Sequence, residues 1–164
     1  STETLQGKVI WITGASSGIG EHLAYTLAEV GVDLALSGTN VKNLTSVQEK
    51  CLADFPQTVV RIVVEGILQK VKGHTSTGNM QKALSPLRPQ VDVLVNNAGL
   101  CRNGMFESHS SQEFERNLFD VNVFGAVSLA RLVVRHFKQR QHRGQIVVTS
   151  SMAGRTGDRI YISY

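Results

Sequence analysis

The chain contains few cysteines and no long apolar run. Cys51 and Cys101 are its two cysteines, and they lie far apart without metal-ligand or redox spacing. We therefore expect reduced thiols in an intracellular protein. The five histidines are not paired with Cys, Asp or Glu at ligand spacing, so no metal site is expected. No apolar run approaches the length that crosses a bilayer, and we expect no transmembrane segment in this chain.

The overall composition describes one globular domain. At 164 residues the chain is long enough for a sizeable core and too short for two ordinary domains. Its 41% hydrophobic and 18% charged residues are typical of a soluble folded protein, and the net charge of +4 is mild. The chain begins at Ser1 and carries no basic-then-apolar leader. We expect an intracellular protein, either cytoplasmic or associated with a membrane through a segment that is not present here.

The stretch from Val9 to Gly20, VIWITGASSGIG, joins a short apolar strand to a glycine-rich turn, and residues 21–30 then show helical spacing. In this order the parts predict the phosphate-binding corner of a dinucleotide fold, with the helix N-terminus facing the anion. Gly14 permits the tight turn, Gly18 lets a pyrophosphate approach the backbone, and Gly20 lets helix and strand pack closely. A turn that only connects strand and helix is the alternative. The candidate cofactor-binding residues of this corner are Gly14, Ser16, Ser17, Gly18, Ile19 and Gly20.

Strands and helices alternate along the rest of the chain. Further strands are predicted at residues 32–37, 58–64, 91–95 and 145–149, and helices at residues 41–55 and from Ser110 to about Gln141. Residues 65–89 are the least readable, with a helix expected late in them, and residues 150–164 are expected to form a loop. Right-handed crossovers then predict an α/β, Rossmann-type doubly wound parallel sheet of strand order 3-2-1-4-5, with helices on both faces. Residues 1–164 form a single domain in this interpretation.

Small polar residues follow three of these strands. The first strand ends at the glycine turn, the fourth at Asn96-Asn97-Ala98-Gly99, and the fifth at Ser150-Ser151. Each group alone is ordinary turn chemistry. Because ligands of doubly wound sheets bind outside the carboxyl ends of the strands, the coincidence of the three groups favours a ligand site between strands 1 and 4.

Three features together resemble the short-chain dehydrogenase/reductase family. They are the TGxxxGxG spacing of TGASSGIG, the NNAG run, and the thirteen positions between Ser151 and Tyr164. The resemblance covers nearly the whole chain and is weakest over residues 65–89. It implies an NAD(P)(H)-dependent oxidoreductase that transfers a hydride between nicotinamide and a small-molecule carbonyl or alcohol substrate. Within the family the match is best for enzymes acting on retinoid, steroid or other lipophilic carbonyls.

The resemblance assigns catalytic roles to Asn122, Ser151 and Tyr164. A carbonyl that accepts a hydride becomes an alkoxide, so it needs a hydrogen-bond donor, here Ser151, and a proton source, here Tyr164. Ser151 is preferred to Ser150 because Ser-Met-Ala-Gly resembles the family's sequence after the serine, and because the count then reaches Tyr164. The family's asparagine at the position of Asn122 holds a water on the proton relay. An asparagine within a helix is otherwise usually a surface or packing residue.

Tyr164 also marks the largest departure from the family pattern. The unperturbed pKa of tyrosine is about 10, so the side chain needs a nearby cation to act near neutrality. In the family this cation is a lysine four residues later, whereas the sequence ends at Tyr164. We therefore interpret the sequence as the N-terminal, C-terminally incomplete part of a longer enzyme, with a native truncated form as the alternative. Alone, it is expected to turn over little or nothing.

The choice of cofactor depends on the end of the second strand. An acidic residue there would bind the ribose 2′-hydroxyl of NAD and repel the 2′-phosphate of NADP. This strand instead leads into Ser37, Thr39 and Asn40, with Lys42 nearby and no acid, so NADP is preferred and NAD is the alternative. The resemblance adds Glu65 near the adenine, and Asn97, Ala98 and Gly99 on the adenosine side, as cofactor-binding residues.

The remaining expectations concern partners and a competing class of function. A basic cluster of Arg135, Lys138, Arg140 and Arg143 near the end of the long helix could suggest nucleic acid. The aromatic residue among them, Phe137, belongs to the apolar pattern of the helix, so we favour a solvated helix C-terminus and expect no nucleic-acid partner. The family commonly dimerises through this helix, which implies a homodimer or homotetramer for the parent protein. The competing class is a non-catalytic dinucleotide-binding sensor or scaffold of the same fold.

Overall fold

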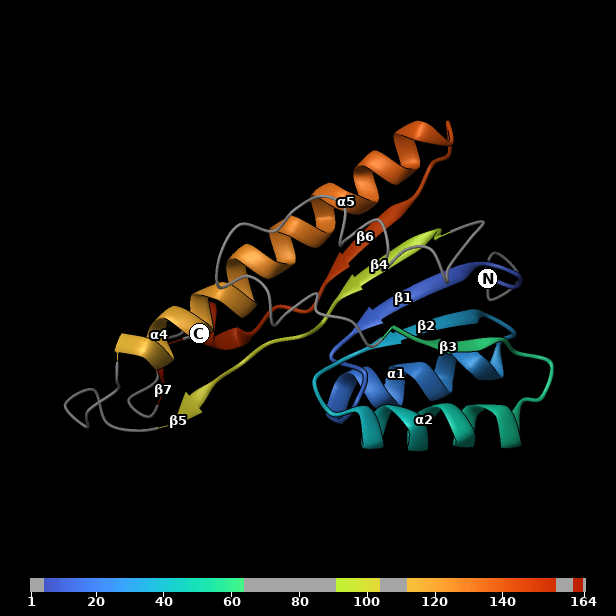
Figure 1. Cartoon of the computed structure of the whole chain (residues 1–164), viewed down its shortest axis with the longest axis horizontal. Helices are drawn as coiled ribbons and strands as arrows, with labels where there is room; N and C mark the ends of the chain where they lie inside the picture. The colour runs from blue at the N-terminus through green and yellow to red at the C-terminus, as the bar shows by residue number, and fades with distance from the viewer. Residues whose placement is uncertain (1–4, 64–90, 104–111, 156–160, 164) are drawn as a thin grey trace.

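A computed structural model describes residues 5–63, 91–103, 112–155 and 161–163 (Figure 1). Its main sheet has five parallel strands in the order β3-β2-β1-β4-β6. These strands are β1 (Val9–Thr13), β2 (Asp33–Ser37), β3 (Val60–Ile62), β4 (Val93–Asn96) and β6 (Gln145–Val148). Since β6 is the fifth strand of this sheet along the chain, the predicted order 3-2-1-4-5 is confirmed. Glu65, Tyr164 and the helix expected late in residues 65–89 lie outside the described residues.

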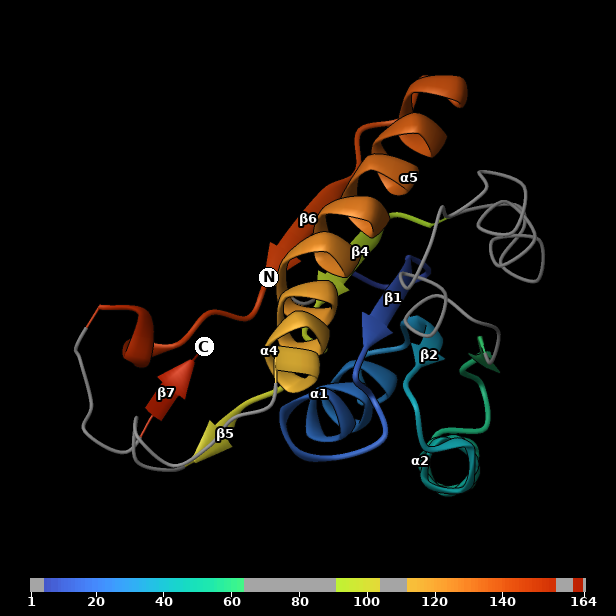
Figure 2. The same ribbon diagram turned by 60° about the vertical axis from the view of Figure 1, so that its left-hand side comes forward.

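Helices cover both faces of the sheet, as predicted. On one face lie α1 (Gly18–Glu29) and α2 (Val41–Asp54), and on the other lies one long helix made of α4 (Gln112–Phe119), a π-helical segment η3 (Asp120–Gly125) and α5 (Ala126–Gln139). Figures 1 and 2 show α5 of this long helix running alongside β6 and β4.

Alternation along β1 explains why the sheet is buried on both faces. Ile10 and Ile12 belong to the core cluster that includes apolar residues of α1 and α2, whereas Trp11 belongs to the cluster that includes residues of α5. All three side chains are at most 3% exposed. A continuous apolar run is what a strand covered on both faces requires, and it predicted the strand correctly.

Two parts of the chain differ from the sequence-based expectation. The glycine motif itself enters the helix, because α1 begins at Gly18 rather than at Glu21. The segment expected to be a loop up to Tyr164 contains a 3₁₀ turn (Met152–Gly154) and strand β7 (Tyr161–Ser163), so that expectation is wrong. β7 pairs antiparallel with β5 (Arg102–Asn103), and the two lie side by side apart from the main sheet in Figures 1 and 2. This pairing joins residues distant in sequence, which local patterns do not reveal.

The long helix also differs from the expectation that no apolar run in this chain approaches the length that crosses a bilayer. Residues Gln112–Gln139 form a helix of 28 residues with a mean hydropathy of 1.4 in its most apolar window, so by length and composition it could cross a membrane. Core helices of soluble proteins meet the same criterion. Here Leu129, Leu132 and Val133 of this helix are buried in a core cluster that also contains Trp11 and Leu94 of the sheet.

Candidate functional site

A cleft of about 1180 Å³ lies at the carboxyl ends of the central strands. Five segments contribute most of its lining: the glycine turn after β1, the residues that follow β2, the residues that follow β4, the π-helical segment, and the residues that follow β6. Of the predicted site residues it brings together Gly14, Ser16, Ser17, Ile19, Thr39, Asn97, Ala98, Gly99, Asn122 and Ser151. Gly18, Gly20, Ser37 and Asn40 do not line it, and Glu65 and Tyr164 lie outside the described residues.

Each of the three motif glycines is a glycine for a different structural reason. Gly14 has φ +66°, and a Cβ there would lie 2.8 Å from the Cα of Ala98, so the turn packs against the chain after β4. A Cβ on Gly20 would collide with the carbonyl oxygen of Gly14. Gly18 has φ +58° and nothing within 4 Å of its Cβ position. Gly14 and Gly20 therefore close the turn, whereas Gly18 leaves open space beside the backbone.

The N-terminus of α1 is open beside that space. Ser17 is the N-cap residue, but its side chain makes no capping hydrogen bond, and Ser17, Gly18 and Ile19 are all exposed. The first N–H groups of a helix have no partner within the helix, and the helix dipole makes this end partly positive. This uncapped end beside an open glycine fits the diphosphate of a dinucleotide.

Asn97 ties three strands together at the floor of the cleft. Its Nδ2 donates to the backbone oxygens of Thr13 (3.1 Å) and Gly14 (3.4 Å), and its Oδ1 accepts from the hydroxyl of Thr149 (3.0 Å). The Thr13 hydroxyl accepts from the backbone N–H groups of Asn97 and Ala98, both at 3.0 Å, and donates to Val95 O. Sequence reasoning missed Thr13 and Thr149, although each is a hydroxyl residue at the end of a strand, next to a motif.

Asn122 holds the cleft wall through both arms of its carboxamide. Its Oδ1 accepts from the backbone N–H of Leu100 at 2.7 Å, and its Nδ2 donates to the Leu100 carbonyl at 2.8 Å. Asn122 lies in the π-helical segment, and Leu100 directly follows the NNAG run. The two hydrogen bonds therefore fix this wall of the cleft to the chain after β4. Ser150 and Ser151 line the cleft from the end of β6.

The residues after β2 are divided between the sheet and the cleft. The buried Ser37 hydroxyl accepts from Trp11 Nε1 at 3.0 Å and donates to Ile12 O at 3.4 Å, so it is turned into the sheet. Asn40 caps α2, where its Oδ1 accepts from the backbone N–H of Asn43 at 3.0 Å. Of the three residues predicted here to bind the cofactor, Ser37, Thr39 and Asn40, only Thr39 lines the cleft.

The resolved pKa shifts lie away from the cleft. Burial, followed by a 2.8 Å hydrogen bond to Glu21, raises the pKa of Tyr25 to about 12. Burial also raises the pKa of the Cys51 thiol. Cys51 is a buried free thiol, and Cys101 is exposed. Within the described ranges, no group of three or more His, Cys, Asp or Glu residues could hold a metal ion.

Comparison with known proteins gives matches along nearly the whole chain. The short chain dehydrogenase family matches residues 8–164. The human dehydrogenase/reductase SDR family member 7 is 34% identical over 163 residues, which cover 98% of this chain and 46% of the relative. The Arabidopsis thaliana 11-beta-hydroxysteroid dehydrogenase-like 4A is 33% identical, with coverage of 95% and 50%. The chain thus spans about half the length of these relatives.

Solved structures share the fold. A structure of NAD⁺-bound xylitol dehydrogenase has a TM-score of 0.78 at 28% identity, covering 94% of this chain and 57% of its own. A structure described as an NAD(P)-dependent gluconate 5-dehydrogenase from Beutenbergia cavernae, with NADP bound at low occupancy, has a TM-score of 0.79 at 27% identity, covering 96% and 59%. Similar chains thus bind either dinucleotide.

Proposed function

This chain belongs to the short-chain dehydrogenase family, and we propose that it forms the cofactor-binding part of an NADP(H)-dependent oxidoreductase acting on a carbonyl or alcohol substrate. The observation that carries the proposal is the uncapped N-terminus of α1 beside the open Gly18, in a cleft that also contains Asn122 and Ser151. When bound, the nicotinamide supplies the hydride that is exchanged with the substrate carbonyl carbon.

The residues of the cleft would hold the dinucleotide along its length. Ser16, Ser17, Gly18 and Ile19, with the N–H groups of the first turn of α1, would bind the diphosphate. Gly14 and Gly20 would act indirectly, by keeping the turn closed beneath it. Asn97, Ala98 and Gly99 would form the surface under the adenosine side, and Glu65 is proposed to approach the adenine.

NADP is the proposed preference. No carboxylate stands at the end of β2, where it would repel a 2′-phosphate. Thr39 lines the cleft there, and Lys42 follows in the first turn of α2. The hydroxyl and the ammonium would interact with a phosphate, whereas neither supplies the carboxylate that binds the ribose 2′-hydroxyl of NAD.

Proton transfer is assigned to the chain's own hydroxyl groups. Tyr164 would exchange the proton with the substrate oxygen, Ser151 would orient that oxygen, and Asn122 would support the relay. The proposed substrates of the whole protein are retinoid, steroid or other lipophilic carbonyls. Its proposed location is intracellular, either cytoplasmic or membrane-associated.

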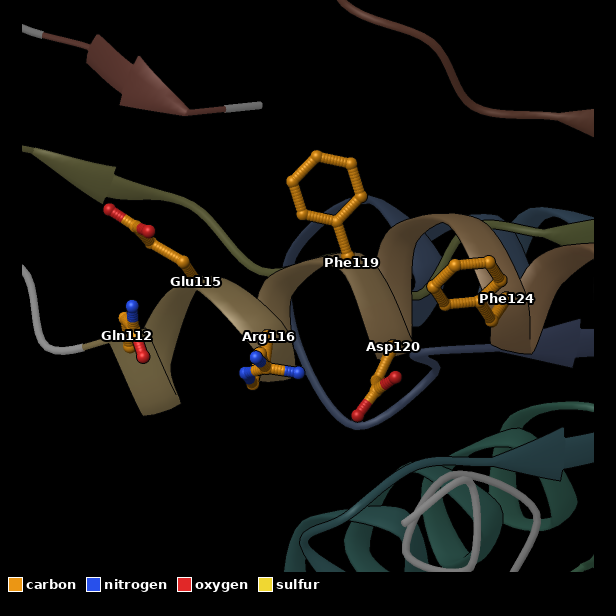
Figure 3. Close-up of a pocket in the computed structure, with 6 residues that line it drawn as sticks. All are labelled: Gln112, Glu115, Arg116, Phe119, Asp120 and Phe124. Atoms are coloured by element: carbon orange, nitrogen blue, oxygen red, sulfur yellow. The ribbon is translucent and has the colours of Figure 1, made fainter. Parts of the chain in front are cut away.

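We propose that the whole protein forms a homodimer through the long helix, or a homotetramer assembled from such dimers. Phe119, Phe124, Val127 and Val134 are between 39% and 55% exposed along this helix, as is Val123, which also lines the cleft. Figure 3 shows the first part of this helix, where Phe119 and Phe124 help to line a hollow of about 490 Å³ and the Phe119 ring points away from the charged side chains of Arg116 and Asp120. Acidic residues gather in α4 and η3, and basic residues in α5. Two copies packed antiparallel about Val123 would therefore place opposite charges together.

The cofactor proposal is tested by fluorescence titration of the chain with NADPH and, separately, NADH. We expect saturable binding of NADPH, weaker binding of NADH, and loss of both in Gly18→Val. The matched control is Gly7→Val. Gly7 also has a positive φ (+73°) and nothing within 4 Å of its Cβ position, but it precedes β1 and so lies at the amino ends of the strands, away from the cleft. A folded chain that binds neither dinucleotide contradicts the proposal. Turnover by the whole protein separates an enzyme from a non-catalytic sensor.

A further inference from the structure

Asn96, the last residue of β4, connects the sheet to the long helix at a second point. Its side chain is 7% exposed, and its Nδ2 donates to the carbonyl oxygen of Ala126 at 3.1 Å. Ala126 is the first residue of α5, directly after the π-helical segment. Four residues after Asn96, Leu100 exchanges two hydrogen bonds with Asn122, which is four residues before Ala126. The Asn96–Ala126 and Asn122–Leu100 links therefore join two chain segments that run in opposite directions, and most of the π-helical segment lies between the two links.

The other arm of Asn96 makes no hydrogen bond. Its Oδ1 is buried and has no partner within the described part of the chain. An unsatisfied buried polar atom destabilises the folded state, and an apolar side chain of similar shape avoids this cost. Folding stability alone therefore does not explain why this residue is an asparagine. A role in positioning another element of the fold does explain it.

The π-helical segment is the element that needs placing. A π-helix is rarely stable by itself, because the α-helical register competes with it. Slipping by one residue into that register would rotate the side chain of Asn122 by roughly 100° relative to α5. Such a rotation would break both hydrogen bonds to Leu100 and move the cleft wall formed by Val121, Asn122 and Val123.

We propose that Asn96 is a positioning residue that holds the π-helical register by pinning Ala126, and so keeps Asn122 on Leu100. Asn96 bonds to Ala126, at the far end of the segment from Leu100, and it also lines the cleft. Its effect on the Asn122–Leu100 link is therefore transmitted through the π-helical segment. The consequence for cofactor binding rests on the proposed function, whereas the consequence for the Asn122–Leu100 link does not.

The direct test is hydrogen exchange of the Leu100 backbone amide, measured by NMR in Asn96→Leu and in the smaller variant Asn96→Ser. Because a hydrogen bond contributes about 1 kcal/mol, we expect this amide to exchange at least about fivefold faster in both variants. The matched control is Thr58→Val, since the buried Thr58 hydroxyl donates to a helix carbonyl, Ala28 O, at 3.1 Å, far from the cleft. In this control the Leu100 amide should keep its protection. Unchanged Leu100 exchange in either folded Asn96 variant overturns the proposal.

A binding experiment gives the second readout. Asn96→Leu should weaken NADPH binding by about fivefold or more, while adenosine 2′,5′-bisphosphate, which lacks the nicotinamide half, should bind as it does to the original chain. Equal weakening of both ligands contradicts an effect transmitted through the π-helical segment. If the original chain binds neither ligand, the proposed function fails, and Leu100 exchange still decides the role of Asn96.

Discussion

Thr149 donates a hydrogen bond from its hydroxyl to the side-chain oxygen of Asn97, at 3.0 Å across 52 positions of sequence. Through Asn97, which also bonds the backbone of Thr13, this contact links β6 to β4 and β1 at the floor of the cleft. Ser151 follows two residues later, so the contact also helps to set where that serine stands.

Replacing Thr149 by valine should weaken this link. The side chain keeps its shape and loses the hydroxyl, and because Thr149 is exposed the expected loss is about 0.5–1 kcal/mol of unfolding free energy. Urea unfolding measures it. Thr149→Ser keeps the hydroxyl and serves as the control. Equal destabilisation by serine and valine would show that the hydrogen bond has no part in the effect.

Replacing Gly20 by alanine should destabilise the fold strongly. The added Cβ would collide with the Gly14 carbonyl oxygen and would lie 2.7 Å from Asn97 Nδ2, and neither the turn nor the clamped amide can move freely. Overpacking of this kind costs about 1–3 kcal/mol or more. The control is Gly154→Ala, where nothing lies within 4 Å of the new Cβ. Thermal unfolding compares them, and similar melting temperatures for the two variants would refute the expectation.

Tyr25 should make stability depend on pH in the alkaline range. Its pKa in the folded chain is about 12, above the unfolded value of 10.0, so the folded state holds the phenolic proton more tightly. Its contribution is fully present below pH 10 and is lost as the pH rises towards 12. Tyr25→Phe should remove this part of the decline. Absorbance of tyrosinate, taken as the difference between the original chain and the variant, measures the pKa directly. A midpoint near 10 would contradict the shift.

Val127→Glu should disrupt the proposed dimer. Val127 is 43% exposed in the apolar stripe, where pairing would bury the new carboxylate of each copy against apolar side chains of the other. Val41→Glu is the control, because Val41 is 46% exposed at the start of α2 on the opposite side of the sheet. Sedimentation velocity should show a dimer for the original chain and for Val41→Glu, and a monomer for Val127→Glu. A monomeric original chain rules out this interface for the described chain.

The sequence-based site prediction was informative at the level of segments more than of single side chains. Ser16, Ser17 and Ile19 line the cleft because a strand–turn–helix sequence with this glycine spacing builds the same corner wherever it occurs. Ser37 and Asn40 were chosen for their position after β2, but their side chains bond to the sheet and to the start of α2. Which way a polar side chain turns depends on partners that the local sequence does not contain.

The sequence by itself determined the order of elements and, through alternation and right-handed crossovers, the doubly wound sheet with a cleft at its switch point. These features depend on local propensity and on a periodic pattern of burial, and both are written in consecutive residues. Tertiary structure alone decided the clamp of Asn97 across three strands, the π-helical turn that places Asn122 on Leu100, and the pairing of β7 with β5. Each joins groups distant in sequence, so it exists only once the chain has packed.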